Sequence, residues 1–251
     1  MAYRIFLAGA AGAVGQRLIP QLLAAGHQVT GTTRNADKAA RLETLGVEPV
    51  LVDVFDAHAL SRAMLGARPD MVIHQLTDLP AGLDPSRMGK AIVRNARIRD
   101  EGTRNLAAAA AASGVRRLIA QSIAWAYAPG QQPYTESDPL DADAEGNRGI
   151  SVRGVIALET TVLNGPFAGV VLRYGQLYGP GTGTEAAGGA SPLHVDAAAY
   201  AALLALDKGA PGIFNVAEPN EAVSTRKAVE ELGWRADFRL PPEAIHAETS
   251  T

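Results

Sequence analysis

Cysteine is absent from the 251 residues of the chain. Without thiols the protein has no disulfide framework, no thiolate metal site and no cysteine nucleophile. We therefore expect a reducing, cytoplasmic setting. Residues 1–9 agree with this expectation, because they lack the length and flanks of an export signal and lead directly into a predicted strand.

A strong charge of one sign, long apolar runs and grouped histidines are also missing. The formal net charge is −3, so nucleic acid is not an expected partner. The most apolar stretch, residues 106–112, is far shorter than the roughly 20 residues of a membrane span, so a membrane is not expected either. The five histidines lie apart with no i, i+4 pair, which predicts no metal site. We interpret His74 and His194 as structural.

Short apolar runs alternate with longer segments of helical period along the first two thirds of the chain. This alternation indicates repeated βαβ units and therefore the α/β class, with a doubly wound parallel sheet, the Rossmann fold. The predicted strands span residues 4–8, 28–32, 48–52, 71–75, 117–121 and 169–173. The predicted helices span residues 14–25, 37–45, 57–65, one long helix within 90–113, and one near 152–163.

The composition changes after residue 178, where glycine, alanine and threonine dominate. We divide the chain into a Rossmann domain, residues 1–178, and a small, trimmed C-terminal cap, residues 179–251, that is interleaved with the core. In the cap we predict helices over 195–206 and 225–232 and a strand over 213–216. Residues 79–87 and 128–149 read as loops, and Pro20 predicts a kink or break in the first helix.

Three glycines at spacing G-x-x-G-x-x-G follow the first predicted strand and open the first predicted helix. They are Gly9, Gly12 and Gly15. Glycines allow a tight turn and a close backbone approach to a pyrophosphate, which the helix N-terminus binds with free N–H groups. A turn that only packs helix on strand is the simpler interpretation, but the surrounding βαβ frame favours a dinucleotide site.

The second strand ends in Thr33 and Arg34, with Lys38 one turn into the next helix. An NAD-selective site usually carries an acidic residue at this point, and none is present. Two cations there suit the 2′-phosphate of NADP(H), so we favour NADP(H) over NAD(H). The alternative is a solvated basic residue at a helix start.

Asp53 ends the third strand. Its carboxylate is placed to accept a bond from an adenine amino group or, equally, to form an Asx turn or helix cap. The full set of cofactor contacts that we expect is Gly9, Ala11, Gly12, Ala13, Val14, Gly15, Thr33, Arg34, Lys38, Asp53, Val54, Leu76, Tyr174 and Leu177.

Several separated segments resemble the extended short-chain dehydrogenase/reductases, the NAD-dependent epimerase/dehydratase group, in order and over nearly the whole chain. Besides the glycine turn, they are residues 52–53, 72–74, 102–106, 117–122, 172–181, 193–196 and 212–216. The resemblance implies a Rossmann fold, a nicotinamide cofactor, and a turn at Tyr174–Leu177 that lies beside the nicotinamide.

The family's catalytic residues are replaced in this sequence. The family has a Ser or Thr after the fifth strand and a Tyr-x-x-x-Lys pair on the next helix. Aligned on Glu159, Ser151 stands at the tyrosine position and Val155 at the lysine position, and Ile123 stands at the usual Ser/Thr, beside Ser122. No Tyr-x-x-x-Lys occurs anywhere in the chain.

Two further departures concern the substrate. Arg99 stands where the family often has asparagine, and only thirteen positions separate Gly181 from His194, where the family usually carries a longer insertion. A sugar-nucleotide epimerase or dehydratase, which needs that insertion and the missing pair, is therefore our least favoured function.

We expect the proton donor beside the nicotinamide to be a hydroxyl at or just after the end of the fifth or sixth predicted strand. Our two catalytic candidates are Ser122 and Tyr127, with Tyr134 and Tyr174 as further possibilities, and for each a purely structural role is the competing interpretation. Trp125 and Tyr127 flank the expected pocket and suit a flat aromatic substrate.

Together these patterns predict an atypical NADP(H)-dependent reductase, resembling the ketoreductases of the extended family. It would transfer hydride to a ketone or quinone-like carbonyl of a small, aromatic or polyketide substrate. The alternative is a non-catalytic NADP(H)-binding sensor or scaffold. A homodimer is compatible with the alanine-rich face of residues 105–112, although the same alanines would also suit packing on the sheet.

Overall fold

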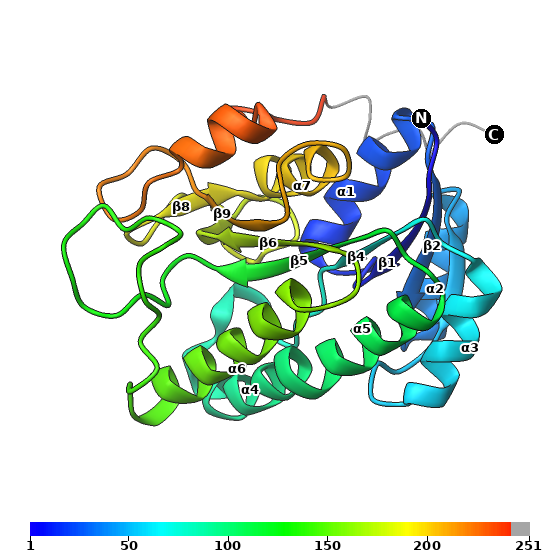
Figure 1. Cartoon of the computed structure of the whole chain (residues 1–251), viewed down its shortest axis with the longest axis horizontal. Coiled ribbons are helices and arrows are strands. Elements are labelled where there is room, and N and C mark those ends of the chain that lie inside the picture. Colours follow the sequence, from blue (N-terminus) through cyan, green and yellow to red (C-terminus); the bar gives the residue numbers. More distant parts are fainter. Residues whose placement is uncertain (242–251) are drawn as a thin grey trace.

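A seven-stranded, wholly parallel sheet forms the centre of the protein, whose computed structural model describes residues 1–241 (Figure 1). The strands are β1 (Arg4–Ala8), β2 (Gln28–Thr33), β3 (Glu48–Leu51), β4 (Met71–His74), β5 (Arg117–Ile123), β6 (Ala168–Tyr174) and β9 (Gly212–Val216). Their order is β3-β2-β1-β4-β5-β6-β9. The order reverses between β1 and β4, and open α/β sheets bind ligands outside the carboxyl ends of the strands at such a point.

Helices cover both faces of the sheet, as Figure 1 shows. One face carries α1 (Ala13–Ala24), α2 (Ala36–Thr44) and α7 (Val195–Leu204), and the other carries α3 (Ala57–Ala67), α4 (Pro85–Arg97), α5 (Thr103–Ala112) and α6 (Gly146–Leu163). Side chains of β1 alternate between the two cores, with Ile5 and Leu7 on the first side and Phe6 on the second. This alternation is the period of two that a strand imposes. The predicted doubly wound fold is confirmed.

The C-terminal segment contributes to the main sheet. Strand β9, predicted as part of the cap, pairs with β6 as its seventh strand, with Leu172 opposite Phe214. Two three-residue strands, β7 (Gln176–Tyr178) and β8 (Pro192–His194), form a second small parallel sheet that was not predicted. Strands of three residues are too short to show a period of two in the sequence.

The helices differ from prediction in four places. The long helix predicted within 90–113 begins at Pro85, where Asp84 accepts a hydrogen bond from the Ser86 N–H, and it contains a π-helical turn, η2 (Ile98–Gly102). A short 3-10 turn, η1 (Ala81–Leu83), occupies part of the predicted loop 79–87. Near the C-terminus, the predicted helix 225–232 is present from residue 226 and continues as a π-helical segment, η3 (Ala228–Leu232). We expected a kink or a break at Pro20, and helix α1 runs through this residue without a break.

The alanine-rich helix α5 packs inside the chain. Leu106, Ala107, Ala109 and Ala110 are buried in the core beneath the sheet. These side chains pack on the sheet, while Ala108, Ala111 and Ala112 are exposed, and the homodimer stays a prediction. Among residues 1–241 no helix has both the length and the apolar character needed to span a bilayer.

Candidate functional site

The glycine turn folds back on the end of β4. Gly9 has φ +91°, and a Cβ added there would lie 2.6 Å from the carbonyl carbon and oxygen of Gln75, so only glycine fits. The Gly12 N–H donates a 3.0 Å hydrogen bond to the Gly9 carbonyl. A Cβ on Gly15 would lie 2.4 Å from the same Gly9 oxygen, so the third glycine permits close packing of α1 on β1. The tight turn at Gly9 and the close helix–strand packing at Gly15 are two of the three roles that glycines have in a dinucleotide-binding turn, and the third is a close backbone approach to the pyrophosphate at the second glycine.

The first turn of α1 is open to an anion. Gly12 is the N-cap residue, and no side chain caps the helix and no acidic residue occupies its first turn. The side chain of Val14 is buried in the core, so Ala13, Val14 and Gly15 can serve a pyrophosphate through their backbone N–H groups. The cradle of glycines and the free N–H groups fit the diphosphate of a dinucleotide.

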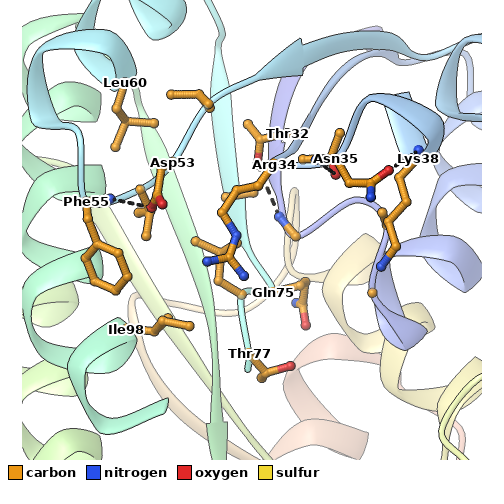
Figure 2. Close-up of a pocket in the computed structure, with 18 residues that line it drawn as sticks. Thr32, Arg34, Asn35, Lys38, Asp53, Phe55, Leu60, Gln75, Thr77 and Ile98 are labelled. Carbon is orange, nitrogen blue, oxygen red and sulfur yellow. Dashed lines mark hydrogen bonds between the residues drawn. The ribbon is translucent and has the colours of Figure 1, made fainter. Parts of the chain in front are cut away.

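A cavity of about 290 Å³ lies beside this turn, at the carboxyl ends of β1 to β4 (Figure 2). It brings together most of the predicted cofactor residues: Gly9, Ala11, Gly12, Thr33, Arg34, Lys38, Asp53, Val54 and Leu76. It also contains residues that the sequence analysis missed: Ala8, Thr32, Asn35, Val52, Phe55, Leu60, Gln75, Thr77 and Ile98. The predicted Tyr174 and Leu177 do not line it. A volume of this size suits one end of a dinucleotide, with the remainder extending over the sheet edge.

The two predicted cations stand at the junction of β2 and α2. Asn35 caps α2 by accepting a 3.0 Å hydrogen bond from the Lys38 N–H, and Thr33 accepts one of 3.2 Å from the Asn35 N–H. Figure 2 shows the Arg34 side chain extending into the cavity, between Asp53 and Lys38. Neither Arg34 nor Lys38 forms an ion pair with any residue in the range 1–241. Both positive charges are therefore available to an anionic ligand.

Asp53 forms a local turn and faces the cavity as well. Its Oδ1 accepts a 3.0 Å hydrogen bond from the Phe55 N–H, which is the Asx turn of the simpler interpretation. Apolar walls surround it, because Phe55, Leu60 and Ile98 line the same space. The guanidinium of Arg97 lies 4.0 Å from the centre of the Phe55 ring and holds that ring in place. A flat, weakly polar group such as adenine fits between these walls, and a contact of adenine with Asp53 remains a prediction.

A second cavity, of about 320 Å³, has aromatic walls and follows β5. The rings of Tyr127 and Tyr134 stack with centroids 5.0 Å apart and planes 14° from parallel. Trp125, which is 39% exposed, completes the aromatic wall. Its other lining residues are Ala124, Pro129, Gln132, Arg148, Ala190, Ser191, Ala222 and Val223. Trp125 and Tyr127 were predicted at this cavity from the sequence, whereas residues 190–191 and 222–223 were not, because they are distant in sequence.

Ser122 is a buried structural residue. This corrects the prediction that it is catalytic. The side chain has no exposed surface, and its hydroxyl donates a 2.7 Å hydrogen bond to Oε1 of Glu159. The same carboxylate accepts two bonds, of 2.9 and 2.7 Å, from the guanidinium of Arg173. A hydroxyl sealed between β5 and α6 cannot reach a substrate.

The tyrosines are also committed to internal partners. The Tyr127 hydroxyl donates a 2.6 Å hydrogen bond to Oδ1 of Asn215, and burial raises the pKa of this phenol. Its ring lines the aromatic cavity, but its proton is held by Asn215. Tyr174 donates a 2.9 Å bond to the Ala198 carbonyl, is 1% exposed, and has a phenol pKa that burial raises. Its side chain belongs to the core, which corrects its interpretation as a possible proton donor.

The α6 residues aligned with the family's Tyr and Lys point inward. Ser151 is 7% exposed, and Val155 is fully buried in an apolar cluster with Ile123, Ala126 and Val152. Neither residue can supply a phenol or an ammonium group, and the cation of α6 that lines the aromatic cavity is Arg148, which donates hydrogen bonds to the carbonyls of Trp125 and Tyr127.

Both histidines discussed above have structural partners. His74 Nε2 lies 2.9 Å from Oγ1 of Thr103, and its Nδ1 accepts a 3.2 Å hydrogen bond from the Leu76 N–H. Burial lowers the pKa of His74 to about 4. His194 caps α7 by accepting a bond from the Asp196 N–H. Across residues 1–241 no group of three or more metal-ligating side chains is found.

Known proteins similar to this chain identify the family to which it belongs. A family profile described as NAD(P)H-binding matches residues 9–145, which include the glycine turn and most of the first cavity. The chain belongs to this NAD(P)H-binding family. Its fold is that of the extended short-chain dehydrogenase/reductases. The UDP-glucose 4-epimerase of Thermus thermophilus, solved with NAD, is similar with a TM-score of 0.75 at 19% identity, covering 99% of this chain and 97% of that one.

The curated relatives include reductases. The chain is 39% identical over 240 residues to the 3-diazoavenalumate denitrifying reductase of a Streptomyces species, covering 87% of this chain and 77% of that protein. It is 28% identical over 139 residues to a 4-hydroxy-2-methyl-3-oxo-4-farnesyl-3,4-dihydroquinoline-1-oxide ketoreductase of Stigmatella aurantiaca. This match covers 55% of this chain and 39% of that protein. The protein is accordingly an oxidoreductase, an NAD(P)H-dependent reductase.

Proposed function

We propose that the protein transfers a hydride from NADPH to a small, flat substrate with a quinone-like or ketone electrophile, without a Ser-Tyr-Lys triad. The observation that carries this proposal is the pairing of a cofactor cavity containing two unpaired cations with an aromatic cavity beside an α6 that lacks the tyrosine and lysine. Both cavities lie at the carboxyl edge of the sheet, where one extended cofactor and its substrate can meet.

The preference for the phosphorylated cofactor follows from charge. Arg34 and Lys38 stand where a 2′-phosphate would lie, and Thr33 ends β2 where an NAD site would carry an acid. An arginine can bind phosphate oxygens with two parallel N–H groups, an interaction that a ribose hydroxyl does not offer.

The reaction that suits these residues depends on positioning. When bound, NADPH supplies the hydride. The chain holds its cofactor with the glycine turn and offers the substrate ring an aromatic surface on Trp125 and Tyr134, while the buried Tyr127 ring stacks against Tyr134. Close positioning of the reacting atoms can itself remove several kcal/mol of barrier. With Ser122 buried and Tyr127 bound to Asn215, the proton comes from water or from a hydroxyl of the substrate.

The names of the relatives support an electrophile of this kind. One relative is named for reducing a diazo compound and another for reducing a 3-oxo group on a dihydroquinoline ring. Both groups accept a hydride, which is the step that an aromatic cavity beside a nicotinamide site would serve.

A substrate panel with purified protein tests the proposal. Naphthoquinones, aromatic ketones and an ortho-diazoquinone are each mixed with NADPH or NADH, and loss of the reduced nicotinamide absorbance is followed. We expect turnover of at least one aromatic electrophile, faster with NADPH. Tight NADPH binding without oxidation by any of these compounds would contradict the proposed reaction.

A further inference from the structure

Within residues 1–241 three arginines are at least nine-tenths buried, and one of them differs from the others. Arg17 donates two hydrogen bonds to Asp196, and Arg173 donates two to Glu159. Arg99 is 6% exposed, yet its guanidinium donates no hydrogen bond to any atom within residues 1–241. Buried cations in proteins are normally paired, because removing a charge from water without a partner costs several kcal/mol.

No carboxylate near Arg99 is free to pair with it. Glu159 attracts Arg99 electrostatically, but both of its oxygens already accept bonds from Ser122 and Arg173. Burial lowers the pKa of Arg99 to about 10, so the guanidinium is still charged at neutral pH. A permanent charge with unused N–H groups is therefore held in a largely buried side chain, and none of its nitrogens is among the fully enclosed polar atoms that lack a partner within residues 1–241, so they stay accessible to a ligand.

Arg99 lies close to the ligand edge of the sheet, next to residues of the cofactor cavity, although it is not itself a lining residue of either cavity. It belongs to η2, a π-helical turn, and such turns often occur at functional sites. The preceding residue, Ile98, lines the cofactor cavity (Figure 2), and Gly102 packs against Val54 of the same cavity. The positive charge of Arg99 also contributes to the lowered pKa of His74, which lies at the end of β4. Arg99 thus lies between the cofactor cavity, the end of β4 and helix α6.

We propose that Arg99 is a catalytic residue that binds a negatively charged oxygen of an aromatic substrate, and this proposal rests on the reductase function proposed above. In carbonyl reduction the hydride from NADPH forms a new C–H bond, the π electron pair of the C=O bond moves to oxygen, and NADP⁺ is produced. The guanidinium stabilises the oxyanion, and a proton from water then completes the alcohol. Preorganised charge of this kind is a large contribution to catalysis in a site that excludes water.

The substrate is a better partner for Arg99 than the cofactor. The diphosphate is served by the α1 N-terminus and the 2′-phosphate by Arg34 and Lys38, while the ribose hydroxyls are neutral. Neutral hydroxyls compensate a buried cation less well than an anionic oxygen does.

Binding of 4-nitrophenol in the presence of NADP⁺ tests the proposal without turnover, because the phenol and phenolate absorb differently. The wild-type protein should bind the phenolate more tightly and lower the pKa of the bound probe. Arg99→Met should weaken phenolate binding at least tenfold and abolish the spectral shift, and Arg99→Lys should retain part of it. Arg104→Met is the matched control, because Arg104 is an exposed arginine on the adjoining helix, paired with Asp100, and should leave the shift unchanged.

Two measurements separate this role from others. Calorimetry should give Arg99→Met an NADPH affinity within threefold of wild type, and urea unfolding should give it an equal or higher midpoint, because an unpaired buried cation has been replaced by an apolar side chain. Failure of the wild type to bind phenolate, or equal binding by Arg99→Met, overturns the proposal. So does a tenfold loss of NADPH affinity with phenolate binding intact, which would assign Arg99 to the cofactor. If the phenolate result holds while no panel substrate is reduced, the proposed reaction fails and the anion site stands.

Discussion

Ser122 and Arg173 donate to the same atom, Oε1 of Glu159, at 2.7 and 2.9 Å. Ser122 comes from β5, Arg173 from β6 and Glu159 from α6, so one carboxylate joins two neighbouring strands to the helix that covers them. The buried carboxylate requires hydrogen-bond donors, and the Ser122 hydroxyl is one of them. The bond therefore explains the residue without a catalytic role.

Ser122→Ala should reduce stability and leave the chemistry intact. Loss of a buried hydrogen bond to a charged acceptor should lower the free energy of unfolding by about 1–3 kcal/mol. We expect kcat with the best panel substrate to stay within about twofold of wild type, because the hydroxyl has no access to a ligand. Urea unfolding and steady-state kinetics measure the two effects, and a drop in kcat of a hundredfold or more at unchanged stability would restore the catalytic interpretation.

The three glycines of the turn should differ in their tolerance of alanine. A methyl group on Gly15 would lie 2.4 Å from the Gly9 carbonyl oxygen, whereas one on Gly12 would lie 3.3 Å from it. Gly15→Ala should cost about 1–3 kcal/mol of stability through overpacking, and Gly12→Ala should be close to wild type in stability. Thermal unfolding of the two variants side by side checks the order, and a reversed order would show that the turn is packed differently.

Arg34→Ala should weaken NADPH binding and spare NADH. Loss of charge-assisted hydrogen bonds to a phosphate should cost about 1.5–3 kcal/mol, roughly a ten- to hundredfold increase in the NADPH Kd. Arg41→Ala is the control, because Arg41 is a basic residue of α2 that does not line the cofactor cavity. Isothermal calorimetry with both cofactors gives the values, and equal wild-type affinity for NADPH and NADH would refute the preference.

Acid should destabilise the protein through His74. The folded state holds this imidazole neutral with a pKa of about 4, against an ordinary value of 6.5. Between pH 6.5 and 4 the imidazole is therefore protonated in the unfolded chain and neutral in the folded chain. The free energy of unfolding falls as the pH falls through this range, by up to about 1.4 kcal/mol per pH unit. Comparison of urea midpoints at pH 7 and 4.5 should show a smaller change for His74→Gln than for wild type. An identical change in both would place the acid sensitivity elsewhere.

Trp125→Ala should weaken substrate binding with little effect on the cofactor. Stacking on an exposed aromatic wall contributes about 0.5–1.5 kcal/mol beyond buried area, so KM for an aromatic substrate should rise roughly three- to tenfold. Trp234, which is 2% exposed and donates to the Ala197 carbonyl, is unsuitable as a control because its loss would damage the core. Leu163→Ala, at a surface position on α6, serves that purpose. An unchanged KM would remove Trp125 from the substrate site.

Sequence reasoning succeeded where local pattern and local function coincide. The six strands predicted before the cap are all present because each alternates with a helix long enough to show its period, and the glycine turn was recognisable because its chemistry depends on three residues in one segment. Arg34, Lys38 and Asp53 share one cavity because parallel strands bring their carboxyl ends to the same edge.

Predictions that depended on the direction of a side chain were less successful. Ser122 follows Gln121 on a strand whose neighbours alternate between faces, so a shift of one position decides whether a hydroxyl meets the ligand or the core. Tyr174 is buried for a similar reason. Phe55 and Ile98 were missed as cavity walls because an apolar residue at a ligand surface has the same sequence signature as one in the core.

Strand β9 has a consequence for engineering. Because it pairs with β6 along Val170–Tyr174, the chain beyond residue 178 cannot be exchanged with that of a relative as an independent module. Chimeras that alter substrate choice should instead replace only the segment between β7 and β8, residues 179–191, and retain everything from α7 onwards. New specificities would then be sought by grafting a single surface loop onto an undisturbed scaffold.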